Sequence, residues 1–280
     1  MTTTAPRRTF LGWTGVSALS AIGAIGAVGA ATSTSPALAK NPATDCGQLA
    51  LGKPSATGPG TKYDAAGHAL NFPGNTLICH LNQPGATFTA LTDIAAALRA
   101  QVGDNNLTWT PPSSYHMTVV DGVTNAGRRP GDWPHLLPLD APLEDCNRYV
   151  ADKLRRFDLG MDLPIRMVAD ETLATQTGTQ FLLRPIDAAE NARPRDLRNR
   201  ISQAIGVRHP NHDSYGFHIT FAYYIRPFAT VAEERRYQSL WLTAIQELRR
   251  RVPVIEMGAP EYCLFDSMND FKTQFLLARR

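Results

Sequence analysis

Two short segments share one pattern: Tyr115-His116-Met117-Thr118-Val119 and Phe217-His218-Ile219-Thr220-Phe221. In each segment an aromatic residue precedes a histidine, and a threonine follows that histidine two positions later. Side chains two apart on a β-strand point to the same face of the sheet, so each histidine shares a face with its threonine. If the two strands lie side by side, two imidazoles and two hydroxyls converge. The alternative is that both are ordinary strand histidines, satisfied by neighbouring hydroxyls.

The apolar pattern around these segments predicts a mixed α and β domain whose two halves have similar content. Strands are expected at 76–81, 115–120, 164–169, 179–186, 217–224, 254–257, 262–265 and 273–277. Helices are expected from about 89, from 142 to 157, from Pro194 to a cap at Gly206, and from about 230 to 250. A polar loop is expected after the first helix, ending at Pro111-Pro112.

The N-terminal segment, residues 1–39, has the layout of a twin-arginine export signal. Arg7-Arg8-Thr9-Phe10-Leu11 precedes an uncharged Gly/Ala-rich stretch and Ala37-Leu38-Ala39. A membrane anchor is the alternative, but the apolar stretch is Gly-rich and shorter than the ~20 residues of a comfortable span. Cleavage predicts an irregular arm at 40–75 and a folded domain at 76–280. The mature protein is expected in the periplasm or outside the cell, and it is not expected to associate with a membrane after cleavage. The twin-arginine export machinery is the expected partner of the precursor.

Composition excludes several classes of protein. The chain has 280 residues, of which 43% are hydrophobic and 19% charged, so it is not collagen-like, coiled-coil or largely disordered. Its formal net charge is +3, and no run of basic residues accounts for it. A binding surface for long nucleic acid is therefore not indicated, whereas a small anionic ligand is compatible with the sequence.

The cysteines allow two interpretations. Cys46, Cys79, Cys146 and Cys263 permit two disulfides in any of three pairings in an oxidising compartment, or they are buried free thiols. None forms a CxxC pair or stands at zinc-ligand spacing to a histidine, so no structural zinc site is expected.

With both motifs in place, the sequence resembles the two-histidine (2H) phosphoesterase superfamily, which carries two His-x-Thr/Ser-x motifs. The likeness spans 76–277 and is strongest to an uncharacterised branch with Phe72-Pro73-Gly74-Asn75-Thr76, Cys79-His80-Leu81 and Ser113-Ser114-Tyr115-His116-Met117-Thr118-Val119. The resemblance implies a two-lobed, pseudo-symmetric α+β fold, with antiparallel sheets forming a central groove and helices outside. It also implies an enzyme without metal or other cofactor that acts on 2′,3′-cyclic nucleotides, related cyclic phosphodiesters or RNA ends.

The chemistry of that reaction fits the residue types. Opening a cyclic phosphodiester needs a proton removed from water and a proton delivered to the departing oxygen, and imidazole performs either task near neutrality. His116 and His218 are therefore the candidate catalytic pair, one as base and one as acid, in an order that the sequence leaves open. The hydroxyls of Thr118 and Thr220 would donate to the phosphoryl oxygens.

Other candidate substrate-binding residues lie near the motifs: Tyr115, Tyr223, Arg128 and Arg129. The tyrosines would stack on a base or donate to phosphate, or they belong to the core. The arginines would form a lid over an anion, or they lie in a solvated loop. His80 also lies on a predicted strand, but Asn82 follows where the motif needs threonine, so a core or supporting role is expected.

Two other functions compete with the phosphodiesterase. One is a metal-dependent hydrolase that uses His116, His218 and a carboxylate such as Asp121 or Asp213, although no HExxH-like motif supports it. The other is a non-catalytic module that binds an anionic ligand or nucleotide in the same groove. The sequence has neither a Gly-rich phosphate loop nor a GxSxG element, so triphosphate hydrolysis and serine-esterase chemistry lack support.

Overall fold

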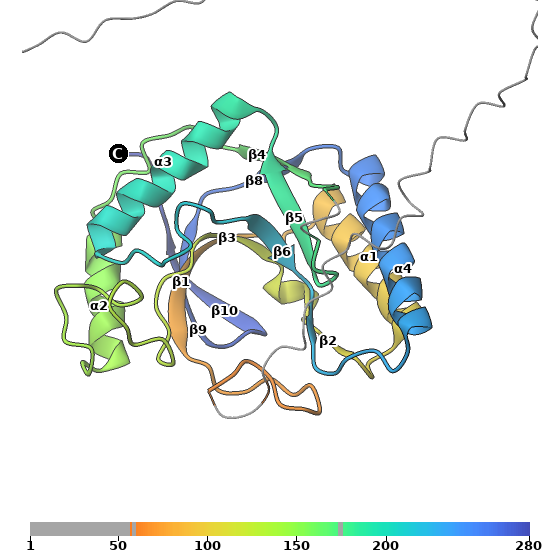
Figure 1. Ribbon diagram of the computed structural model, residues 1–280. Helices are drawn as coiled ribbons and strands as arrows, with labels where there is room; N and C mark the ends of the chain where they lie inside the picture. The colour runs from red at the N-terminus through yellow and green to blue at the C-terminus, as the bar shows by residue number, and fades with distance from the viewer. Residues whose placement is uncertain (1–56, 58–59, 173–175) are drawn as a thin grey trace, which may run out of the picture. The chain divides into compact units, whose positions relative to one another are not determined.

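The computed structural model describes residues 57, 60–172 and 176–280. Within these ranges the chain forms a mixed α+β domain, in which a curled antiparallel sheet carries helices on its outer side (Figure 1). The strands are β1 (Gly74–His80), β2 (Leu107–Trp109), β3 (His116–Val120), β4 (Ile165–Ala169), β5 (Gln180–Pro185), β6 (Phe217–Thr220), β7 (Ala222–Tyr224), β8 (Ile255–Met257), β9 (Glu261–Ser267) and β10 (Asp270–Leu276). The helices are α1 (Ala86–Val102), α2 (Leu143–Leu154), α3 (Ala188–Ile205) and α4 (Val231–Arg251), with a 3₁₀ turn η3 (Pro112–Ser114).

The two motif strands are neighbours at the centre of the main sheet. Its eight strands run in the order β10-β9-β1-β3-β6-β5-β4-β8, and β2 pairs with β7 in a separate two-stranded sheet. β3 and β6 are antiparallel, with Met117 opposite Ile219. On their outer sides β3 pairs with β1 and β6 pairs with β5, so each motif strand has an equivalent position in its half of the sheet. This arrangement confirms the α+β, pseudo-symmetric fold that the sequence predicted.

Alternation along the motif strands separates the core from the groove. Met117, Val119, Phe217 and Ile219 are buried, whereas the histidines and threonines between them remain partly accessible. The buried side packs against the apolar faces of the helices, and α3 contributes Leu197, Ile201 and Ile205. Figure 1 shows α2 with α3, and α1 with α4, outside the curved sheet. Burial of these residues gives the hydrophobic stabilisation that keeps the polar face of both strands turned inward.

Several element boundaries differ from the sequence-based prediction. α3 begins at Ala188, because the Asp187 side chain accepts a hydrogen bond from the Glu190 amide and caps the helix there; Pro194 lies inside it. The strand expected at 217–224 is divided between β6 and β7, since Phe221 and Ala222 donate to the carbonyl of Thr179 and leave the ladder. β2 replaces part of the polar loop expected before Pro111-Pro112.

The described cysteines are buried free thiols: Cys79, Cys146 and Cys263. This excludes the alternative with two disulfides, because Cys46 is the one remaining cysteine and lies outside the described residues. Most of the expected signal and arm at 1–75 also lies outside them. No helix in the described ranges is both long and apolar enough to span a bilayer.

A buried arginine connects the two motif segments. Arg198 of α3 is 2% exposed, and its guanidinium donates to the carbonyl oxygens of Val119, on β3, and of His212, in the loop before β6. The same guanidinium lies 4.1 Å from the centre of the Tyr215 ring. Buried carbonyls without a donor are costly, so Arg198 stabilises the backbone on both sides of the groove.

Replacing Arg198 with Met should lower the free energy of unfolding by about 2–4 kcal/mol, because the variant leaves two buried carbonyls unpaired. Denaturant unfolding measures this change. The control is Arg250→Met, which removes an exposed arginine paired with Glu247 three residues earlier and should leave the stability nearly unchanged. Equal stability of the two variants would contradict a structural role for Arg198.

Candidate active site

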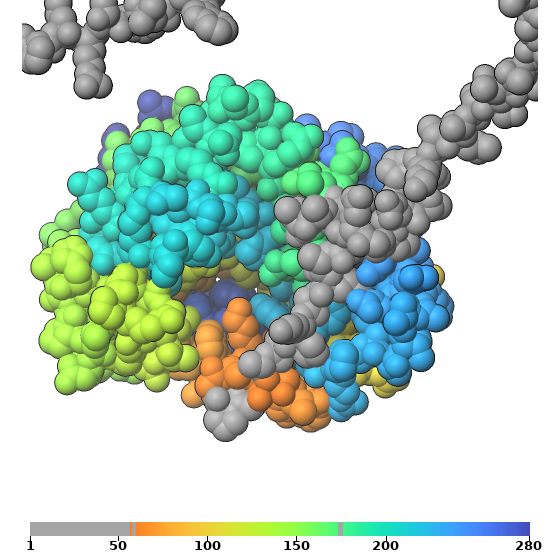
Figure 2. Space-filling view, in the orientation of Figure 1, coloured from red at the N-terminus to blue at the C-terminus, as the bar shows by residue number. Residues whose placement is uncertain are grey.

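His116 and His218 face one pocket on the concave side of the sheet. The pocket has a volume of about 250 Å³ and is lined by both histidines and by Thr118 and Thr220. Figure 2 shows the hollow in this face of the molecule, bordered by the orange segment that precedes β1 and by the yellow-green and cyan segments. The structure therefore brings the two motifs together, as expected if the two motif strands lie side by side.

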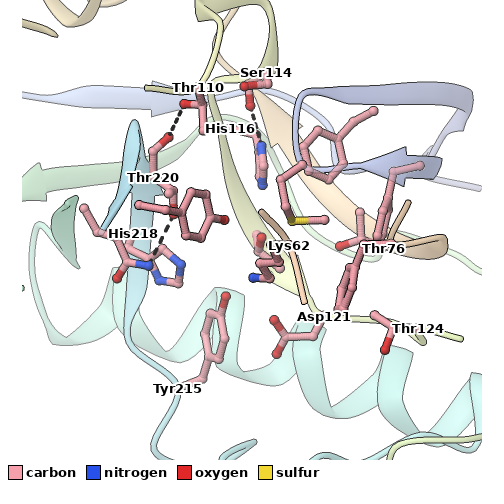
Figure 3. A pocket seen from close by; sticks show the side chains of 17 residues that line it. Lys62, Thr76, Thr110, Ser114, His116, Asp121, Thr124, Tyr215, His218 and Thr220 are labelled. Carbon is pink, nitrogen blue, oxygen red and sulfur yellow. Dashed lines mark hydrogen bonds between the residues drawn. The ribbon is translucent and has the colours of Figure 1, made fainter. Parts of the chain in front are cut away.

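Both imidazoles are anchored in the same way. His116 Nδ1 donates to the carbonyl oxygen of Ser114 at 2.6 Å (Figure 3), and His218 Nδ1 donates to that of Gly216 at 2.8 Å. A carbonyl can only accept, so each Nδ1 carries a hydrogen. In the neutral ring the proton-free nitrogen is therefore Nε2. Each anchor lies two residues before its histidine, so the local backbone fixes both tautomers.

Burial shifts the protonation of both rings. It lowers the pKa of His116 to about 4, although the hydrogen bond to Ser114 opposes the shift, and the charges of His80, His218 and Lys62 lower it further. Burial also lowers the pKa of His218, against the opposing effects of the Gly216 carbonyl and the Asp121 carboxylate. Charge is thus disfavoured at both rings, and Asp121 offsets part of this effect at His218 alone.

Hydroxyl groups surround the pair. Thr220 Oγ1 accepts a hydrogen bond from Gln180 Nε2 at 3.3 Å. Tyr215 lies in the same pocket as Thr118 and Asp121, and the pKa of its hydroxyl is raised, chiefly by burial. The phenol therefore stays protonated at neutral pH and is a hydrogen-bond donor at the wall of the pocket.

Three of the residues predicted to bind substrate lie elsewhere. Tyr115 points to the opposite face of β3 from His116, into the core, where it is 2% exposed. Arg128 donates to the carbonyl oxygens of Leu139 at 2.8 Å and Ala141 at 2.6 Å, and Arg129 pairs with Asp132. None of the three is among the described residues that line the pocket. Both arginines therefore bind groups close to them in the chain: Arg128 binds backbone carbonyls and Arg129 binds a carboxylate.

The pocket also contains two charged groups outside the motifs, of which the sequence analysis considered Asp121 only as a metal ligand and did not single out Lys62. Lys62 comes from the segment before β1, and Asp121 follows β3 directly. Tyr223, which was predicted, does line the pocket, together with Phe271 of β10. Asp121 has a sequence signal, since it lies five residues after the motif histidine at the end of a strand. Lys62 lies in a segment without periodicity, and nothing in the sequence around it marks it as part of the site.

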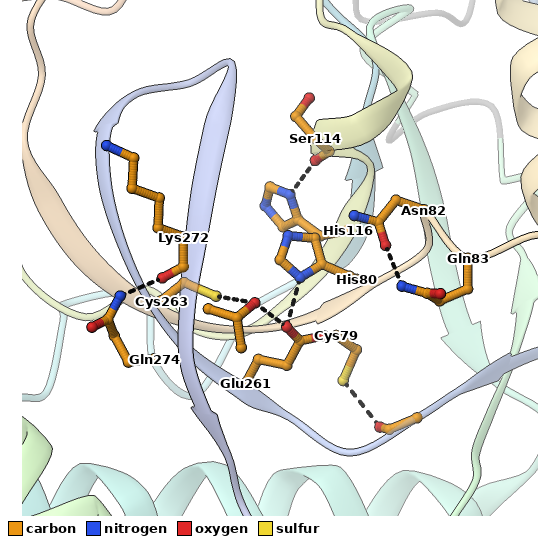
Figure 4. Close-up of polar contacts among 12 residues, drawn as sticks. Cys79, His80, Asn82, Gln83, Ser114, His116, Glu261, Cys263, Lys272 and Gln274 are labelled. Atoms are coloured by element: carbon orange, nitrogen blue, oxygen red, sulfur yellow. Dashed lines mark hydrogen bonds and ion pairs between the residues drawn. The ribbon is translucent and has the colours of Figure 1, made fainter.

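A second polar cluster lies beside His116. His80 is opposite His116 in the β1–β3 register, and its Nδ1 lies 2.8 Å from Glu261 Oε2 (Figure 4). Burial would raise the pKa of Glu261, but hydrogen bonds from His80 and Thr273 bring it below the usual value. His80 thus supports the wall behind the catalytic candidate, as its missing threonine suggested.

Of the two carboxylates considered for a metal-dependent enzyme, Asp121 lines the pocket with His116 and His218, whereas Asp213 does not. In the described part of the chain, the ligand atoms of His80, Glu261 and Cys263 lie within 4.8 Å of one another, and neither His116 nor His218 belongs to this group. Asp213 is exposed and paired with Arg208, away from the lining of the pocket. Among the described residues, the two motif histidines thus do not belong to a close group of ligand atoms.

Two histidines from adjacent strands, each followed by a threonine on the same face, define the two-histidine class of site. A family model named 2H-phosphodiest and described as a domain of unknown function (DUF1868) matches residues 62–178. A conserved protein of unknown function from Agrobacterium tumefaciens is 30% identical, with a TM-score of 0.73, and the match covers 81% of this chain and 94% of that one. The chain belongs to the 2H phosphoesterase superfamily, whose members generally hydrolyse phosphodiester bonds.

Other comparisons add little. A solved structure from Thermus thermophilus is 16% identical with a TM-score of 0.40, covering 74% of this chain and 99% of that one, which is too low a similarity to carry an argument. No curated protein matches the chain significantly.

The pKa of His116 predicts how stability depends on pH. Between about pH 6.5 and pH 4 the unfolded chain binds a proton at this histidine and the native chain does not, so stability falls as the pH is lowered through this interval. Thermal unfolding of His116→Gln between pH 4 and 7 should show a weaker decline. Part of the decline in stability should remain in this variant, because the pKa of His212 is also lowered to about 4. A variant of the exposed His135, His135→Gln, should retain the full slope; equal slopes for all three proteins would contradict a neutral buried His116.

Proposed function

We propose that the protein is an exported, metal-independent phosphodiesterase that hydrolyses 2′,3′-cyclic nucleotides or related cyclic phosphodiester and RNA-end substrates. The observation that carries the proposal is the paired anchoring of His116 and His218. Each Nδ1 is held by a backbone carbonyl, and both rings line the same pocket. Two imidazoles held in this way suit a reaction that takes one proton and gives one proton.

The reaction balances with the two imidazoles alone. Water attacks phosphorus, and the Nε2 of the base takes the proton that the water loses. The bond between phosphorus and one ribose oxygen breaks, and the Nε2 of the acid delivers a proton to that oxygen. The product is a phosphomonoester with a free ribose hydroxyl. The acid must begin the cycle with a proton on both nitrogens, because Nδ1 is engaged with the carbonyl.

The surroundings of the two rings favour one assignment of roles. The pKa of His116, about 4, keeps its ring neutral at physiological pH, as a general base requires. Asp121 favours the protonated form of His218. We therefore assign His116 as the base and His218 as the acid in ring opening. A bound phosphodiester anion raises the pKa of both rings, and this favours protonation of the acid in the complex.

The threonines and Tyr215 complete the polar wall. Thr118 and Thr220 share the face of their histidines and line the pocket, so their hydroxyls are placed to donate to non-bridging oxygens. Tyr215 lines the same pocket as Thr118 and Asp121 and adds a further hydroxyl to it. Tyr223, on β7, lines the pocket and is the candidate aromatic contact for a nucleobase.

Export is proposed from the sequence of residues 1–39. Arg7-Arg8-Thr9-Phe10-Leu11, the uncharged stretch and Ala37-Leu38-Ala39 together suit recognition by the twin-arginine machinery and cleavage after Ala39. The proposed location is the periplasm or the extracellular medium, and the proposed partner of the folded domain is a small cyclic phosphate or RNA end.

Alanine in place of either histidine should reduce kcat/KM for 2′,3′-cyclic nucleotides by about 10²–10⁴-fold, the usual contribution of one general acid or base. The assay uses all four cyclic nucleotides with a chelator present, which should leave the wild-type rate unchanged. His135→Ala is the control, since His135 is exposed and outside the pocket lining. Loss of turnover in chelator would overturn the two-histidine mechanism, and nucleotide binding without turnover would favour a non-catalytic binding module.

Asn in place of Asp121 tests the assignment of roles. Removing the carboxylate lowers the pKa of His218, so the alkaline limb of the kcat/KM profile should move to lower pH if His218 is the acid. If His218 is instead the base, the acidic limb moves to lower pH and the alkaline limb stays. The matched control is Asp213→Asn, which removes an exposed carboxylate and should move neither limb.

A further inference from the structure

Lys62 brings a positive charge into the pocket of the two histidines. Its ammonium lies among the lining groups in Figure 3, in the same pocket as His116, His218 and Asp121. Neither an ion pair nor a hydrogen bond joins this ammonium to another described residue; its contact is with the face of Tyr223, 5.2 Å from the ring centre. Among the described lining residues it is the one lysine or arginine. A half-buried ammonium without a carboxylate partner is suited to receive an anion from solution.

The backbone that carries Lys62 is fixed on both sides. The Lys62 carbonyl accepts from the amide of Leu70 at 3.0 Å, and the next residue, Tyr63, forms a bridge with Ala69. Tyr63 is 2% exposed, and its hydroxyl donates to Asn269 Oδ1, in the turn between β9 and β10, at 2.9 Å. The segment at 60–73 is therefore attached to the rim of the sheet and presents Lys62 to the groove.

The position of Lys62 relative to the histidines suggests what it binds. Lys62 lines the same pocket as His116 and His218, so its side chain and both rings face one bound ligand. The reacting phosphorus must also lie between the two Nε2 atoms, because one imidazole serves the attacking water and the other serves the leaving oxygen. A non-bridging phosphoryl oxygen placed there comes within reach of a flexible four-carbon ammonium side chain. Asp121 repels an anion, so the two charges orient a ligand that carries its phosphoryl group at the Lys62 side.

We propose that Lys62 binds the non-bridging oxygens of the substrate's phosphoryl group, and that the segment 60–73 is part of the active site. The proposal rests on the proposed function for the identity of the substrate, but the claim that Lys62 forms an oxyanion site stands on the contacts described above. The family match begins at residue 62, which agrees with the inclusion of this lysine in the domain. Negative charge on the phosphoryl oxygens grows during attack, so the ammonium contributes to kcat as well as to binding.

Binding of inorganic phosphate tests the oxyanion site without requiring turnover. The titration follows the ring signals of His116 and His218 by NMR in the purified domain-containing chain. Lys62→Met, which removes the charge and keeps the length of the side chain, should weaken phosphate binding about 10–100-fold. Lys62→Arg keeps the charge and should stay within about threefold of the wild type. Lys272→Met is the matched control, because Lys272 is exposed and paired with Asp266 at 2.9 Å, and it should bind phosphate as the wild type does.

Each result decides the proposal. Unchanged phosphate affinity in Lys62→Met, or no phosphate binding by the wild type, would overturn it; melting temperatures of all variants show whether a loss of binding reflects unfolding. Turnover of cyclic nucleotides is measured in parallel. In Lys62→Met, kcat should fall and KM should rise. If the wild type turns over no cyclic nucleotide while phosphate binding still depends on Lys62, the proposed function fails and the oxyanion site stands.

Discussion

The antiparallel pairing of β3 with β6 is the constraint on which the rest of the site depends. One pair of partners, Met117 and Ile219, joins the two motif strands. Because side chains alternate along a strand, this register turns His116 and His218 to the same face while their apolar neighbours enter the core. A shift by one residue would bury the imidazoles of one strand and expose its core residues. The hydrophobic effect that stabilises the sheet therefore also fixes which groups can meet in the groove.

Much of this arrangement follows from the pattern of the sequence. Repetition of His-x-Thr on two apolar strands predicts two polar faces, and the resemblance to a superfamily predicts that they are adjacent. The prediction succeeds for His116, Thr118, His218 and Thr220 because period-two alternation is a local property, and the core enforces it. The same alternation explains the misassigned Tyr115, which stands next to a motif histidine and for that reason points the other way.

The charged residues of the pocket could not be predicted in the same way. Arg128 and Arg129 are near the first motif in the chain, but the turn around them offers carbonyls and a carboxylate that bind both guanidinium groups. Lys62 is remote from both motifs, and its place depends on the burial of Tyr63 against the β9–β10 turn. Arg198 likewise acts on backbone carbonyls of two separate segments. Contacts between parts of the chain that are distant in sequence leave no periodic signal, so they are visible only in the folded domain.

The carbonyl anchors of the two histidines have a consequence for successive catalytic cycles. A carbonyl neither gives nor takes a proton, so Ser114 and Gly216 hold the rings in place without storing charge for them. Under the proposed chemistry each cycle ends with the protonation of the two rings exchanged: the former base holds an extra proton and the former acid has lost one. Bulk water must then restore the starting distribution through the open mouth of the groove. The enzyme would thus depend on solvent exchange between turnovers, and a ligand that seals the groove would trap it in the spent protonation state.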